Sequence, residues 1–236
     1  MGWALKLCAE RDASRGVGYH TPSVAIQAHS TGTKLGGRGQ IRGGDPMMAR
    51  MTRPHLLGID DGPFEKGQPR PVPIVGVMME GADLVEAVAR TEFEVDGPGV
   101  TEFLGEWIFG LRLRPSLQGI VLGGITIAGL AVIDIQALSR ALGVPTLVVN
   151  RRDPGNHRLH EALDSAGLRE RGQIVECTPP AFEAQPGLWV AHAGIERDAA
   201  EELVRASLRK SKLPEPLRVA HLIARALVTG ESRGRV

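Results

Sequence analysis

The sequence predicts an α/β fold built around one mixed β-sheet. After residue 52, apolar runs of strand length alternate with amphipathic segments of helix length. The first three apolar runs are joined by short connections, which favours an antiparallel meander. The later runs are separated by segments long enough for a crossover helix, which favours parallel pairing. We therefore expect three antiparallel strands followed by parallel strands with crossover helices.

The composition is that of a globular protein with an aliphatic core. The 236 residues are 42% hydrophobic and 23% charged, and only 4% are aromatic. A formal net charge of +1 excludes a strongly basic surface over the whole molecule but allows a local basic patch. Two cysteines far apart in sequence, Cys8 and Cys177, are typical of neither a disulfide framework nor a zinc site. No apolar run is long enough for a membrane span, and we expect a cytoplasmic protein with no membrane partner.

Residues 1–52 differ from the rest of the chain. They are rich in Gly, Ser, Thr, Arg and Gln and have no sustained apolar period, which predicts a disordered or weakly ordered extension before a domain at 53–236. The Arg and Gly content is compatible with RNA contact, and an extension with no role in the fold is the ordinary alternative. Methionines at 47, 48 and 51 leave open a start codon assigned too far upstream, so that residues 1–52 would not be expressed.

The predicted meander comprises strands at 56–62, 73–79 and 84–95. A helix at 101–113, with Thr101 as its N-cap, follows. Further along, we expect a buried strand at 117–122, a helix at 127–142, a strand at 144–149, a helix at 157–168, strands at 173–177 and 188–192, and helices at 199–210 and 217–228. This is the element order of an RNase H-like mixed sheet, although order alone does not assign a function.

The first strand ends in two adjacent carboxylates, Asp60 and Asp61. Acidic side chains at a strand end can bind a hard cation such as Mg²⁺. Because neighbouring residues on a regular strand point to opposite faces, only one of the two is expected to be a direct ligand. The alternative is turn chemistry, since Asp-Asp-Gly is a common turn sequence.

Three further acids are candidates. Asp96 follows the third strand and precedes Gly-Pro, so it is either a turn residue or a ligand near the edge of the first strand. Asp134 lies between two isoleucines in a predicted helix, where a partly buried acid needs a partner; it either forms a structural ion pair or belongs to the site. Glu102 is explained by its place in a first helical turn.

Contacts with phosphate are predicted at one end of the sheet. The backbone amides of Gly123 and Gly124 follow a buried strand, and Arg151 follows the next one. Close backbone approach and a solvated loop are the ordinary alternatives. Glu215 and Arg218 are expected to fix the last helix to the sheet, and His221 is expected to be packed rather than to act as a ligand.

Three separated stretches resemble a known family. They are Gly58-Ile59-Asp60-Asp61-Gly62, residues 124–130 (GITIAGL) with Asp134-Ile135, and residues 213–224 (LPEPLRVAHLIA). Together they resemble domain-of-unknown-function family 99, an uncharacterised prokaryotic family related to endonuclease V, over residues 53–235. The relationship implies an RNase H-like fold, and endonuclease V enzymes use Mg²⁺ to cut nucleic acid near deaminated purines.

The resemblance transfers the catalytic residues only in part. Asp60 matches the first-strand aspartate of endonuclease V, and Glu102 is a candidate for its glutamate. Gly123 or Gly124 stands where the enzyme has its second aspartate. The late histidine or acid of the enzyme matches near Ile195, and His192 is close but not aligned. Acids typical of the uncharacterised family would form a rearranged site: Asp61, Asp96 and Asp134.

Two hypotheses follow from the resemblance. One is a Mg²⁺-dependent nuclease acting on nucleic acid, with Asp60 and Asp96 as metal ligands and Asp61 and Asp134 as further catalytic residues. The other is a non-catalytic protein that binds nucleic acid or a partner and keeps the fold with a degraded metal site. The glycines at 123 and 124 favour the second, and the remaining acids favour the first. DNA or RNA preference and oligomeric state are left open.

Overall fold

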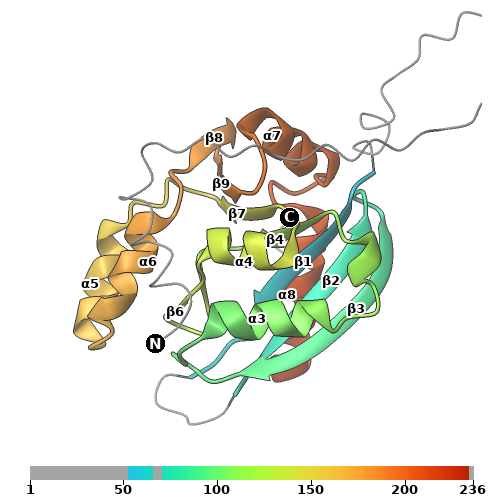
Figure 1. Cartoon of the computed structure of the whole chain (residues 1–236). Helices are drawn as coiled ribbons and strands as arrows, with labels where there is room; N and C mark the ends of the chain where they lie inside the picture. The colour runs from blue at the N-terminus through green and yellow to red at the C-terminus, as the bar shows by residue number, and fades with distance from the viewer. Residues whose placement is uncertain (1–52, 66–70, 234–236) are drawn as a thin grey trace, which may run out of the picture.

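The computed structural model describes residues 53–65 and 71–233, and its centre is a seven-stranded sheet (Figure 1). The strands are β1 (His55–Asp61), β2 (Val72–Glu80), β3 (Leu84–Phe93), β4 (Gly119–Leu122), β7 (Thr146–Asn150), β8 (Phe182–Gln185) and β9 (Leu188–Ala193). Their order is β3-β2-β1-β4-β7-β9-β8. The meander β1-β2-β3 is antiparallel, and β4 and β7 are parallel to β1. The predicted mixed sheet is confirmed, but β9 pairs antiparallel with β7 and β8 pairs antiparallel with β9, where parallel strands were expected.

Helices cover both faces of this sheet. In Figure 1, α3 and α4 lie in front of the sheet and α8 lies behind it. The core between the sheet and α7 also contains residues of α8, so α7 shares the face of α8. A small two-stranded hairpin, β5 (Thr126–Ile127) with β6 (Ala131–Val132), precedes α4. The helices are α3 (Val100–Phe109), α4 (Ile135–Leu142), α5 (His157–Ser165), α6 (Gly172–Cys177), α7 (Arg197–Ala206) and α8 (Glu215–Thr229).

Alternation along β1 determines which side chains reach each face. Leu57 and Ile59 are buried in the core that includes α3 and α4 residues. Leu56 belongs to the core on the α7 and α8 side. Since side chains alternate along a strand, Asp60 belongs to the α8 face and Asp61 to the α4 face.

Helix α8 packs directly on the backbone of β1. A Cβ atom at Gly58 would lie 2.2 Å from the amide nitrogen of Leu217, and one at Gly62 would lie 3.0 Å from the carbonyl oxygen of Ala224. Glycine therefore permits the close approach. Because two strand residues and four helical residues both span about 6 Å, the contact of Gly58 with Leu217 brings Asp60 next to His221.

The predicted helix at 127–142 is wrong in its first half. The chain forms the β5–β6 hairpin there, with Ala128 and Gly129 at φ 48° and 90° in its turn, and the helix begins only at Ile135. Thr101 is not an N-cap, since Gly99 occupies that position with φ 72°. The buried hydroxyl of Thr101 instead accepts a hydrogen bond from the Asp134 amide at 2.9 Å.

The predicted strand at 173–177 is also wrong, because this segment is helix α6. Its Val175 packs with Leu163 of α5 and Val132 of β6 in a small separate core. Strand β8 was not predicted. Residues 1–52, with the extension and the RNA contact predicted for them, lie outside the described residues. Within the described ranges, no helix combines the length and hydropathy needed to cross a membrane.

Candidate active site

The candidate site centres on Asp60 and His221, which are 161 positions apart in sequence. Asp60 Oδ2 lies 2.7 Å from His221 Nδ1, and its Oδ1 accepts a hydrogen bond from the Asp61 amide at 3.0 Å. The His221 side chain is 53% exposed and that of Asp60 is 22% exposed. The expectation that His221 is packed is therefore wrong, because α8 presents it on the surface beside the end of β1.

The hydrogen bond with Asp60 is the main cause that raises the pKa of the His221 imidazole above its ordinary value of 6.5. Burial and the charge of Arg225 act in the opposite direction. The Asp60–His221 attraction is fully present below the unfolded-state pKa and is lost as pH rises through the raised folded-state pKa. The geometry holds the imidazole in one orientation, with Nε2 available to a second partner.

Asp61 points to the other face of β1, as expected for adjacent strand residues. Its Oδ2 accepts a hydrogen bond from the Ala128 amide at 2.8 Å in the turn of the β5–β6 hairpin. Burial, followed by the charge of Asp60, raises the pKa of the Asp61 carboxyl to about 6. Asp61 is thus a poorly solvated acid that fixes a turn, while Asp60 faces the surface.

Asp96 and Asp134 also bind backbone amides. Asp96, with φ 55°, is a turn residue whose Oδ1 accepts a hydrogen bond from Leu130 at 2.6 Å. Asp134 is the N-cap of α4 and accepts from Gln136 and Ala137, both at 2.9 Å. Asp134 therefore does not lie inside a helix, and its side chain is explained by capping rather than by an ion pair.

The predicted acids do not fit a cation site built by the protein alone. Among residues 53–65 and 71–233, no group of three or more His, Cys, Asp or Glu side chains converges so that it could hold a metal ion. Asp61, Asp96 and Asp134 each use a carboxylate oxygen to accept backbone hydrogen bonds. The predicted metal ligands, Asp60 and Asp96, are therefore not joined in such a group.

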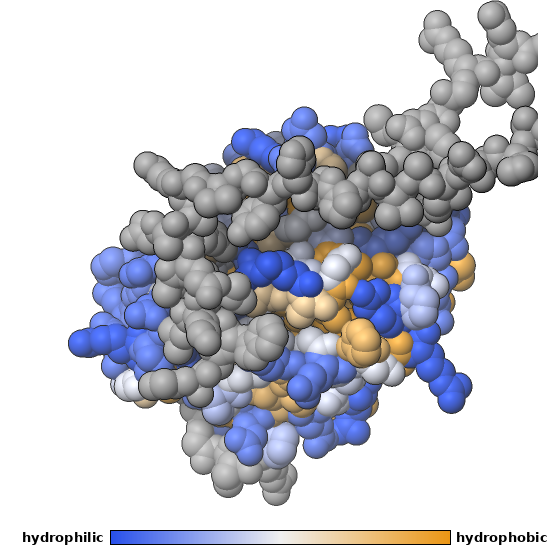
Figure 2. Space-filling model, viewed as in Figure 1, coloured by the Kyte–Doolittle hydropathy of each residue, from blue (hydrophilic) through white to orange (hydrophobic). Residues whose placement is uncertain are grey.

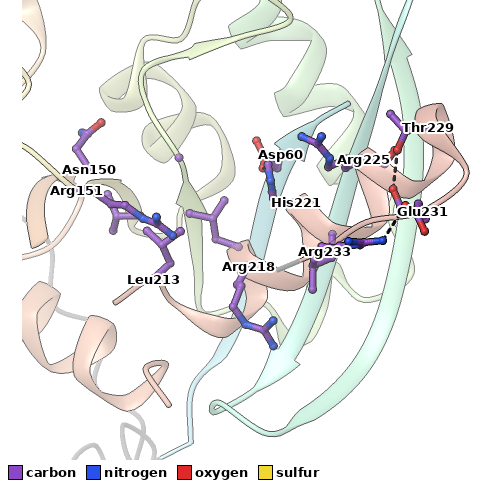
Figure 3. Close-up of a pocket in the computed structure, with 14 residues that line it drawn as sticks. Asp60, Asn150, Arg151, Leu213, Arg218, His221, Arg225, Thr229, Glu231 and Arg233 are labelled. Carbon is purple, nitrogen blue, oxygen red and sulfur yellow. Dashed lines mark hydrogen bonds and ion pairs between the residues drawn. The ribbon is translucent and has the colours of Figure 1, made fainter. Parts of the chain in front are cut away.

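A groove of about 1080 Å³ runs past Asp60 at the carboxyl ends of β1, β4 and β7. These strands are parallel, so their ends meet at one edge of the sheet. Figure 3 shows Asp60 and His221 together, with Arg225 on one side and Arg151 on the other. Neither arginine has an ion-pair partner within the described part of the chain. The groove therefore supplies the local basic patch that the net charge allows.

The predicted phosphate contacts lie at this edge. Gly123 and Arg151 line the groove, and Gly124 lines a smaller pocket of about 470 Å³ that shares Gly123 and Asn150 with it. Arg218 also lines the groove, but its guanidinium forms an ion pair with the buried Glu215 one turn earlier, at 2.6 Å. That pair lies within the first turns of α8 and does not itself bridge the helix to the sheet.

Other candidates lie elsewhere. Glu102 is exposed in the first turn of α3. His192 lies on β9 with Nδ1 2.9 Å from the carbonyl oxygen of Ile195. The residues that sequence reasoning missed are His221 and Arg225. The only available signal was their spacing with Arg218 on one face of the last helix.

The raised pKa of Asp61 predicts a measurable pH dependence of stability. Between about pH 4 and 6 the folded state holds a proton that the unfolded state has released, so the free energy of unfolding falls as pH rises. The Asp61→Asn chain lacks this loss. We expect its stability relative to the parent to increase by about 1–3 kcal/mol between pH 4 and pH 7.

Urea denaturation at several pH values measures this difference. Asp83→Asn is the matched control, because its side chain is 53% exposed at the β2–β3 turn; its curve should follow that of the parent. If the difference in the free energy of unfolding between Asp61→Asn and the parent does not change with pH, the raised pKa of Asp61 is contradicted.

The fold and the groove define a mixed α/β protein with one carboxylate–imidazole pair in a basic groove. The chain belongs to the endonuclease dU family, whose model matches residues 53–228. It is 38% identical over 183 residues to a UPF0215 protein of Methanothermobacter thermautotrophicus, covering 76% of this chain and 90% of that protein. A UPF0215 protein of Thermococcus gammatolerans is 36% identical over 194 residues, covering 78% and 98%.

One solved structure shows the same architecture, and a more distant one resembles it less. A protein of unknown function from Archaeoglobus fulgidus matches with a TM-score of 0.70 and 33% identity, over 75% of this chain and all of that one. Endonuclease V of Ciona intestinalis, in complex with inosine-containing DNA, matches with a TM-score of 0.47 and 14% identity, over 71% and 82%. A likeness at that level does not by itself assign a function. The predicted membership of a known protein family is confirmed in the coarser form that the chain belongs to the endonuclease dU family.

Proposed function

We propose that this protein cleaves DNA at deoxyuridine, with the phosphodiester backbone bound in the groove beside Asp60 and His221. The observation that carries the proposal is the 2.7 Å contact between these two side chains in a basic groove. The description of the family, endonuclease dU, supports the substrate class. The relation to endonuclease V agrees with a nucleic-acid substrate.

The acid–base chemistry follows from the geometry. When His221 Nδ1–H donates to Asp60, Nε2 keeps its lone pair and can accept a proton from a water that attacks phosphorus. As the new P–O bond forms, the P–O bond to the departing sugar oxygen breaks, and that oxygen takes a proton from solvent. Asp60 thereby holds the tautomer and stabilises the imidazolium that forms. Arg151 and Arg225 attract the phosphate to this position. The predicted Mg²⁺ enters no step here, because the described residues do not build a cation site.

The smaller pocket is suited to an extruded base. Its volume of about 470 Å³ lies within the usual range for small-ligand pockets. It joins the groove at Gly123 and Asn150, so a nucleotide whose phosphate lies in the groove could place its base there. The side-chain amide of Asn150 supplies a donor and an acceptor for a base edge.

The test uses labelled oligonucleotides that carry one deoxyuridine, one deoxyinosine or one thymidine at the same position, and a matched RNA. Each is incubated with the full chain in Mg²⁺, in Mn²⁺ and in chelator. We expect cleavage of the deoxyuridine strand, reduced at least about 100-fold in Asp60→Asn. Asp83→Asn is the control, because Asp83 follows the end of β2 that is farther from Asp60. Equal cleavage by Asp60→Asn, or of the thymidine strand, would refute the proposal.

A second candidate is binding without cleavage. It is favoured by one observation: no three potential metal ligands converge within residues 53–65 and 71–233. The same assay separates the two, because a binding protein would shift the deoxyuridine strand in a gel and leave it intact under all three conditions.

Salt dependence tests the groove independently of cleavage. Each phosphate neutralised by an arginine contributes about −0.7 to −0.9 to the slope of log K against log salt concentration. We expect Arg151→Gln and Arg225→Gln each to weaken DNA binding at all sequences and to reduce the magnitude of that slope by about 1. Fluorescence anisotropy measures both effects.

Arg158→Gln is the matched control, because Arg158 is exposed on α5 and does not line the groove. An unchanged slope for both groove variants would place the DNA elsewhere.

A further inference from the structure

Glu215 and Arg218 form an ion pair within the first turns of α8. Glu215 Oε2 accepts hydrogen bonds from Arg218 Nε at 2.9 Å and from Nη2 at 2.6 Å. The Glu215 side chain is only 6% exposed, and a carboxylate is costly to bury. The pair does not join α8 to another element, because both residues belong to the same helix. Its structural effect is to hold the Arg218 guanidinium in one orientation.

The fixed guanidinium keeps donors for a ligand. A guanidinium has five N–H donors, and Glu215 accepts from two of them. Within residues 53–65 and 71–233, the Arg218 side chain forms no other hydrogen bond. Because Arg218 lines the groove and its side chain is 31% exposed, the remaining donors can reach a ligand there. A guanidinium held in place loses little side-chain freedom when it binds a phosphate.

The groove follows α8 past a row of charged and polar side chains, with one at each helical turn. They are Arg218, His221, Arg225 and Thr229. A sugar–phosphate backbone suits such a row. It suits the hydrophobic surface visible in Figure 2, on the face of the molecule that carries α3 and α4, much less well. The row therefore favours a nucleic-acid strand that runs along the helix.

Arg218 and Arg225 lie on either side of His221 along this row (Figure 3). They are two helical turns apart, or roughly 10 Å, which corresponds to about three nucleotides of a strand that rises 3.4 Å per nucleotide. Arg218 is held toward Glu215, one turn nearer the start of the helix, so its guanidinium extends away from His221. It is therefore suited to a phosphate beyond the one beside His221.

We propose that Arg218 binds a backbone phosphate of the substrate strand, about three nucleotides from the phosphate nearest Arg225, and that Glu215 is the positioning residue that orients the Arg218 guanidinium. This inference rests on the proposed function, which places the strand in the groove with its scissile phosphate beside His221. Glu215 does not line the groove and acts only through Arg218.

Glu215→Gln separates positioning from charge. The change removes a negative charge near the groove, so charge alone would tighten DNA binding. If Glu215 orients Arg218, binding should instead weaken roughly twofold to tenfold, because a freed side chain must be immobilised when DNA binds. Fluorescence anisotropy measures the dissociation constant. Tighter binding by Glu215→Gln would overturn the positioning role.

Arg218→Gln tests the phosphate contact. It should weaken DNA binding more than Glu215→Gln and reduce the magnitude of the salt slope by about 1. Because this variant leaves the Glu215 carboxylate buried without its partner, the double variant Glu215→Gln, Arg218→Gln is measured as well. The double variant should bind no more weakly than Arg218→Gln, since Glu215 acts only through the guanidinium. An unchanged salt slope in the double variant would overturn the contact.

The matched controls are Glu201→Gln and Arg205→Gln. These residues form a comparable ion pair at 3.0 Å, one turn apart on α7, and neither lines the groove. Both controls should bind DNA like the parent. Circular dichroism confirms that each variant is folded.

Neutral phosphates locate the contact on the strand. Deoxyuridine strands with a single uncharged methylphosphonate linkage at successive positions are bound to the Asp60→Asn chain, so that they stay intact. We expect weakened binding at two positions about three nucleotides apart. Adding Arg218→Gln should abolish the penalty at one position, and adding Arg225→Gln should abolish it at the other. If Arg218→Gln leaves every penalty unchanged, Arg218 binds no phosphate.

Cleavage by the parent is measured on the same deoxyuridine strand without a methylphosphonate. A parent that binds this strand and does not cut it would refute the proposed cleavage, while the binding measurements still decide the roles of Arg218 and Glu215. A parent that cuts the strand, with binding that is indifferent to both substitutions, would refute this inference alone.

Discussion

Cleavage by the His221→Gln chain is expected to be at least about 100-fold slower than cleavage by the parent, the usual contribution of a positioned general base. Glutamine retains a similar length and can still donate a hydrogen bond to Asp60, but it cannot accept a proton. Binding of uncleaved DNA should change little, because Arg151 and Arg225 remain. The loss is therefore expected in the rate of the chemical step, measured by single-turnover kinetics.

The pH profile sharpens this prediction. A general base acts in its neutral form, so the parent rate should rise with pH through the raised pKa of His221. In Asp60→Asn the hydrogen bond that raises this pKa is weakened, and the pKa should fall toward the ordinary value of 6.5. An NMR titration of the imidazole measures the shift without any cleavage.

His157→Gln is the matched control, since the His157 side chain is 86% exposed on α5. It should leave both the rate and its pH profile unchanged. A His221→Gln chain that cleaves at the parent rate would exclude the general-base role, and an unchanged His221 pKa in Asp60→Asn would show that the pair does not form in solution.

Alanine at Gly58 is expected to cost more than about 3 kcal/mol of stability or to prevent folding. The added Cβ would lie 2.2 Å from both the Leu217 nitrogen and the Pro216 carbonyl carbon. These are backbone atoms, so no side chain can rotate away and α8 must separate from β1. His221 would then move away from Asp60, and the site would be lost together with the stability.

Urea denaturation measures the cost. Gly155→Ala is the matched control: a Cβ there meets no atom within 4 Å, so that variant should be close to neutral. If Gly58→Ala is as stable as Gly155→Ala, then α8 does not pack on β1 as described.

The errors of prediction in the middle of the chain have one physical cause. Residues 127–134 have helical apolar spacing, but they form a hairpin whose turn places Ala128 and Gly129 at positive φ. That turn is held by carboxylates from distant segments, since Asp61 accepts from Ala128 and Asp96 accepts from Leu130. Local periodicity contains no information about such partners.

Sequence alone determined the mixed sheet, its antiparallel meander and the parallel pairing of β1, β4 and β7, because strand alternation and connection lengths are local properties. The antiparallel pairing of β9 with β7 was not predicted. It also showed that Asp60 and Asp61 point to opposite faces. The tertiary structure decided which acids are structural and which residue completes the site. Gly58 permits α8 to lie on β1, and this contact between segments about 160 positions apart brings His221 to Asp60. No spacing within either segment encodes that distance.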